Sequence, residues 1–239
     1  TVLETPANWS GDTLPNVATP DTATWNGSVT GALALTYGTG LGGAAGNLGL
    51  NLNLTAAQTD ALSIDSATNT AVRINDVTLD SGSGAFTLGD GTGTGATAFA
   101  ITLGGATGQT HTWANNSSNT ATINTDVVFG LGGGGVHALL FSGTGIWDVK
   151  DNLTVTNAAT AGVQFALQKT GTGTLNLSGG GSLKNGPTAF GGAFGSVFKE
   201  GVTNMTAGTY AYNNTELVVG GLDTVGTNTQ LNLSNAGTI

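Results

Sequence analysis

The 239-residue chain contains no cysteine, which removes disulfides, iron–sulfur clusters and thiolate zinc sites together. Charge is also scarce: Lys and Arg number 5, Asp and Glu 14, and the four types make up 8% of the chain. A cytosolic enzyme typically carries about a quarter charged residues. The surface must therefore be made polar mainly by Thr, Asn, Ser and Gly, and the absence of thiols suits a protein outside the cell.

The same composition disfavours two classes of partner. The formal net charge is −9, and a nucleic-acid-binding protein needs clustered Lys and Arg to release counterions from phosphate. The sequence has no run of about 18 apolar residues that could cross a bilayer as a helix. We therefore expect no nucleic-acid partner, no membrane span and no cofactor.

Short alternating segments separated by glycine are the main feature of the sequence, which holds 41 glycines and 38% hydrophobic residues. The clearest is 169–181, where Leu175 and Leu177 point one way and Asn176 and Ser178 the other. This period of two predicts a half-buried strand. The same apolar, spacer, apolar pattern returns at 86–88, 101–103, 217–219 and 231–233.

About twenty such short strands and almost no helix predict an all-β fold. A parallel β-solenoid (β-helix) over 31–239 and a β-sandwich both accommodate them. Asn-Gly hairpin turns are few, whereas Asn recurs at strand ends, as at 75–76, 115–116 and 213–214. Polar ladders of this kind suit the corners of a parallel coil, so we expect the solenoid, with a coil of roughly 20 to 25 residues. The β-sandwich is the alternative.

Residues 1–30 differ in composition from the rest of the chain. Proline blocks ladder pairing, and an indole can cover the open end of a core, so this segment is expected to cap the solenoid or to take part in assembly. It holds three of the four prolines and two of the four tryptophans: Pro6, Pro15, Pro20, Trp9 and Trp25.

The segment 169–179, KTGTGTLNLSG, resembles the autotransporter-associated beta-strand repeat, with looser matches at 201–210 and 217–220. The Asn-Trp, Pro-Asn and Asp-Thr-Ala-Thr-Trp pieces within 8–25 resemble the opening of large bacterial surface proteins that carry these repeats. The resemblance implies a secreted, right-handed β-solenoid on or outside a bacterial cell, acting as a passenger, adhesin or matrix component. It carries no catalytic residues to transfer.

Few residues suggest catalysis or metal binding. Asp148 and Asp151 could form a carboxylate pair of the kind a glycosidase needs, but two aspartates at a solvated turn explain them more simply. His111 and His137 lie 26 residues apart with no ligand at metal-binding spacing. We therefore expect no enzyme, and a carbohydrate-active β-helix enzyme is the third functional alternative.

The two ends of the chain carry the main functional prediction. A solenoid exposes strand edges that recruit other strands unless they are capped. Val2 and Leu3 at one end, and Leu231, Leu233 and Ile239 at the other, are the expected assembly interface. The predicted function is a non-enzymatic, extracellular structural protein that joins head to tail in a bacterial surface fibre or filament.

The second alternative is an adhesin or passenger that binds glycan or a host surface. Such a protein would expose a row of aromatic side chains. The candidates are Trp113, Trp147, Tyr210 and Tyr212.

Overall fold

A computed structural model describes most of the chain. The residues described are 2–3, 5–11, 13–37, 48–66, 71–89, 100–103, 108–129, 135–155, 163–182, 196–207, 210–211, 217–220 and 229–233. Apart from the 3-10 turn η1 (Pro6–Asn8), every regular element among them is a β-strand. All pairs between these strands are parallel, so the prediction of an all-β parallel solenoid is confirmed and the β-sandwich alternative is wrong.

One face of the solenoid is an eight-stranded sheet, which we call sheet A. Its strands follow one another in chain order, so each coil adds one strand to it. They are β2 (Leu33–Tyr37), β4 (Leu62–Ser66), β6 (Phe86–Leu88), β9 (Ala121–Ile123), β12 (Ile146–Val149), β15 (Thr174–Leu177), β18 (Gly201–Met205) and β21 (Thr229–Leu233).

The other faces belong to one thirteen-stranded sheet that is shared out at the long strand β5 (Ala71–Leu79). Residues 77–79 pair with β8 and residues 71–73 pair with β7. The face on the β8 side, sheet B, holds β1 (Thr22–Trp25), β3 (Leu50–Leu54), β5, β8 (Thr110–Asn115), β11 (Gly135–Ser142), β14 (Val163–Lys169), β17 (Ser196–Phe198) and β20 (Leu217–Val219). The face on the β7 side, sheet C, holds β5, β7 (Ala100–Leu103), β10 (Asp126–Phe129), β13 (Leu153–Val155), β16 (Gly181–Ser182) and β19 (Tyr210–Ala211).

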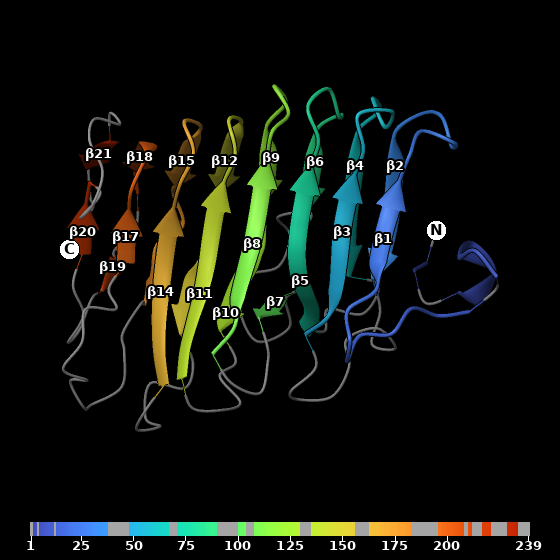
Figure 1. Cartoon of the computed structure of the whole chain (residues 1–239), viewed down its shortest axis with the longest axis horizontal. Coiled ribbons are helices and arrows are strands. Elements are labelled where there is room, and N and C mark those ends of the chain that lie inside the picture. The colour runs from blue at the N-terminus through green and yellow to red at the C-terminus, as the bar shows by residue number, and fades with distance from the viewer. Residues whose placement is uncertain are drawn as a thin grey trace.

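Strands β5 to β19 make five consecutive three-stranded turns, and the strand pairs β1–β2, β3–β4 and β20–β21 add to the two ends (Figure 1). Thr174 pairs with Val202 and Gly201 with Thr229, each 28 residues further on. The expected coil of 20 to 25 residues is wrong, because Phe86 and Ala121 are register partners 35 residues apart. Strands of up to nine residues and variable connections between the faces take more chain than the short strands suggested.

The core is a column of inward side chains from all three faces. In β15 the residues alternate as predicted, with Leu175 and Leu177 buried and Asn176 only half-buried. Trp113, Phe141 and Trp147 lie at the centre, fully buried, with ring centroids 5.4 to 5.9 Å apart. Each aromatic pair of this kind contributes about 0.5–1.5 kcal/mol beyond its area burial.

The stack begins inside the predicted cap segment. Strand β1 pairs in parallel with β3 from Thr22 to Trp25, in the same way as strands in the middle of the molecule. Residues 2–11, together with 13–21, precede this first strand, and η1 lies among them. Sheet B therefore starts before residue 31, and the part of the segment that lies outside the stack is shorter than 1–30.

Candidate functional site at the two ends of the solenoid

The first residues of the chain close part of the N-terminal end. Val2 forms a parallel bridge with Thr36 of β2, and the Leu3 backbone N–H donates to the Thr36 carbonyl at 2.8 Å. The Trp9 indole Nε1 donates to the Leu3 carbonyl, and Asn8 Nδ2 donates to the Val2 carbonyl, both at 2.6 Å. The segment was expected to add a strand to a neighbouring subunit, but here it pairs with sheet A of its own chain.

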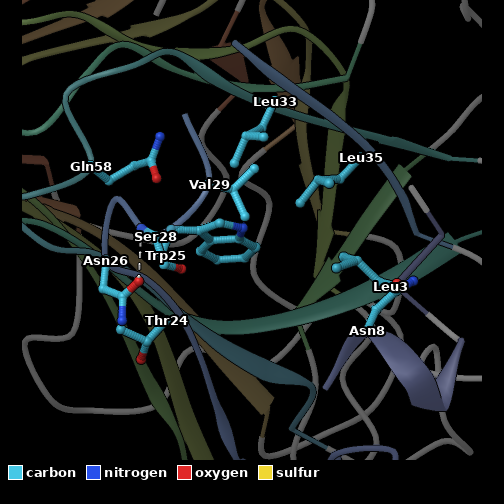
Figure 2. Close-up of a pocket in the computed structure, with 10 residues that line it drawn as sticks. All are labelled: Leu3, Asn8, Thr24, Trp25, Asn26, Ser28, Val29, Leu33, Leu35 and Gln58. Atoms are coloured by element: carbon cyan, nitrogen blue, oxygen red, sulfur yellow. Dashed lines mark hydrogen bonds between the residues drawn. The ribbon is translucent and has the colours of Figure 1, made fainter. Parts of the chain in front are cut away.

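The closure is incomplete, and a pocket of about 330 Å³ remains beside it (Figure 2). The indole of Trp25 lies in the middle of the pocket, with Val29, Leu33 and Leu35 around it. Val29 is 57% exposed. Gln58 lines the same pocket and is almost fully buried; its Nε2 donates to the Asp60 carbonyl at 3.0 Å, and its Oε1 has no hydrogen bond among the described residues.

The pocket is the uncovered end of the solenoid core. Trp25 pairs in register with Leu54, Leu33 with Leu62 and Leu35 with Ile64. All three partners on the second coil are buried. The first-coil residues therefore occupy core positions, but a neighbouring coil covers them on one side only.

The last described coil shows the same situation at the opposite end (Figure 1). Leu231 and Leu233 of β21 continue the inward column of Thr203 and Met205 in β18. Leu233 is 47% exposed, although Met205 at the same position one coil earlier is 1% exposed. Within the described part of the chain, β21 pairs only with β18 and β20 only with β17.

An asparagine ladder on the outer face of sheet A leads to this edge. Asn204 Nδ2 donates to Asn176 Oδ1 at 2.8 Å, and Asn232 Nδ2 donates to Asn204 Oδ1 at 2.7 Å. Like residues stacked in register form such amide chains in parallel β-structures. The ladder fixes the register of the last three coils, so β21 ends the sheet in the same alignment as the strands before it.

The predicted assembly residues thus lie at both ends of the stack. Val2 and Leu3 sit at the N-terminal end, and Leu231 and Leu233 at the C-terminal edge. Ile239 lies outside the described residues. Trp25, Val29 and Gln58 were missed, although the Leu-x-Leu pattern at 33–35 matches that at 231–233 and could have pointed to this end.

The prediction of an exposed aromatic row is wrong for its two tryptophans. Trp113 and Trp147 are fully buried in the core, so neither indole can contact a glycan at the surface. Tyr210 belongs to β19, but its side chain lies outside the described part of the structure, and so does all of Tyr212.

The acidic and histidine candidates form no assembled catalytic or metal site. Asp148 faces Lys150 at 3.9 Å on the surface. Burial, and next the charge of Asp126, raise the pKa of Asp151, so its interacting carboxylate is Asp126 rather than Asp148. His111 is buried in β8. The described residues contain no group of three or more His, Cys, Asp or Glu side chains that could hold a metal.

Lys169, the first residue of the repeat-like segment, is a buried cation at the corner after β14. Its Nζ donates to the carbonyls of Thr170 at 2.8 Å, Gly171 at 2.6 Å and Glu200 at 3.3 Å. The Glu200 carboxylate accepts from the Gly171 N–H at 3.0 Å. Burial lowers the pKa of Lys169 to about 8, against the opposing effect of the Glu200 charge. The amine therefore joins two successive coils through their backbone.

No family model, curated protein or solved structure matches the chain. The resemblance to autotransporter-associated repeat proteins therefore stays a prediction. Among the described residues, no helix is long and apolar enough to cross a membrane.

Replacing Lys169 tests its place in the fold. Its folded pKa, about 8, lies below the ordinary value of 10.5, so above pH 8 the unfolded chain binds more protons than the folded chain. The free energy of unfolding of the wild type should then rise between pH 8 and pH 10 relative to Lys169→Met, with no such difference in slope below pH 7. Urea unfolding at each pH measures both curves, and parallel curves would contradict the buried-cation account.

Proposed function

We propose that this chain is a non-enzymatic, extracellular structural protein whose copies join end to end into a fibre. The observation that carries the proposal is the match between the two ends of sheet A. Strand β2 presents Leu33 and Leu35, and β21 presents Leu231 and Leu233, as inward pairs with a coil on one side only. A second copy stacked on either end would cover them in the way each internal coil covers the next.

The composition of these end strands supports self-association. Natural sheet edges are usually blunted by charged side chains, proline or bulges. Neither β2 (LALTY) nor β21 (TQLNL) contains a charged residue or a proline. Although the chain carries a net charge of −9, the two strands that would meet bring no like charges together.

The role outside the cell and the non-enzymatic character rest on different support. Low charge, the absence of cysteine and the resemblance of 169–179 to bacterial surface repeats favour an extracellular structural role. The one interacting carboxylate pair, Asp126 and Asp151, lines neither the N-terminal pocket nor the shallow polar hollow around Asn51 and Asp76 on β3 and β5. The geometry therefore favours assembly over the enzyme alternative.

Leu233→Asp tests the assembly. Sedimentation velocity over a concentration series should show wild-type species that grow with concentration. The aspartate would bury an unpaired charge at the contact, so association should weaken by roughly 30-fold or more. Ile146→Asp is the matched control, because Ile146 is also an exposed aliphatic residue (39%) but lies in the middle of the stack. Wild-type protein that stays monomeric at every concentration would overturn the proposal.

The location is tested separately. An antibody raised against the purified chain should label intact, unpermeabilised cells of its source, or the matrix around them. A cytosolic marker protein in the same cells should be labelled only after permeabilisation. Labelling of this chain that also requires permeabilisation would contradict an extracellular role.

A further inference from the structure

We infer that the N-terminal pocket is the socket for β21 of a second copy, which pairs with β2 so that Leu231 lies opposite Leu33 and Leu233 opposite Leu35. This inference rests on the proposed end-to-end association and adds its site, direction and register.

The available edge of β2 sets the register. Val2 occupies this edge at Thr36, through the parallel bridge and the hydrogen bond from the Leu3 N–H. Leu33 to Leu35 lie before the bridge and border the open pocket. A parallel strand that ends beside Leu35 fits on the edge without displacing Val2.

The side-chain pattern fixes the same alignment. Inward positions of sheet A alternate with outward ones, and a slip of one residue would turn Leu231 and Leu233 away from the core. In β21 these two leucines already point inward, since they continue the column of the buried residues Thr203 and Met205. Placed opposite Leu33 and Leu35, they would extend the inward column of sheet A from one copy to the next.

The pocket suits such an occupant. Figure 2 shows Leu33, Leu35 and Val29 around the indole of Trp25, on the side where the core is uncovered. A leucine from the next copy would meet these apolar groups, as Leu62 and Ile64 meet Leu33 and Leu35 from the other side. The contact continues the coil-to-coil interface that sheet A already repeats within the chain.

A single-cysteine experiment tests the inference, because the chain has no cysteine of its own. In the inferred register, Ala34 of one copy lies opposite Asn232 of the next. Both are outward positions, so substitution leaves the core intact. Adjacent parallel strands bring such pairs within the Cα separation of about 4.4–6.8 Å that a disulfide needs. Mixing Ala34→Cys with Asn232→Cys under mild oxidation should give a covalent dimer on a non-reducing gel.

The matched controls separate the possible failures. Either variant alone should give no covalent dimer, and Ala34→Cys mixed with Gln230→Cys, a slip of two residues, should give several-fold less. A dimer from Asn232→Cys alone would show tail-to-tail contact, and a better yield with Gln230→Cys would show a different register. Each of these results overturns the inference.

Sedimentation of the same variants distinguishes this inference from the proposed function. Oligomers that form without the Ala34–Asn232 cross-link would overturn the socket and leave end-to-end association standing. If the variants and the wild type are all monomeric, the proposed function and the inference fail together.

Discussion

Every inward side chain of this solenoid is buried by the coils before and after it. Because the strands are parallel and in register, an apolar position on one coil lies directly on the same position of the next. Met205 is covered on both sides, whereas Leu233, one coil further, is covered on one side. The open pocket beside Trp25 and the exposed edge of β21 are two results of this one requirement.

The requirement also explains the polar groups inside the stack. A backbone carbonyl at a corner needs a donor when the next coil removes it from water. Lys169 supplies one at the corner after β14, through three carbonyl contacts that reach the following coil at Glu200. Asn115 does the same earlier in the chain, where its Nδ2 donates to Asn119 and to Ile146 of the next coil.

The sequence predicted the class of fold well, because the alternation of Leu175 and Leu177 with Asn176 depends on one strand alone. It predicted the coil length poorly, since this depends on the connections between faces, which vary from coil to coil. Asparagine ladders were expected at the corners, but the one that forms runs through Asn176, Asn204 and Asn232 in the middle of strands. The aromatic row was misplaced although Trp147 alternates with Asp148, a pattern that indicates an inward indole. Only the structure brings Trp25, Val29 and Leu33 together into one pocket, because that contact depends on where the chain turns between β1 and β2.

The most direct test of end-to-end stacking is amide hydrogen exchange of β21 as a function of protein concentration. The outward-edge amides of this strand have no strand partner among the described residues, so they should exchange fast in dilute solution. On stacking they should become hydrogen-bonded and slow by roughly tenfold or more, while the amides of β15 in the interior stay equally protected throughout. If the β21 amides exchange at the same fast rate at every concentration, no strand pairs with this edge, and the account of assembly is contradicted.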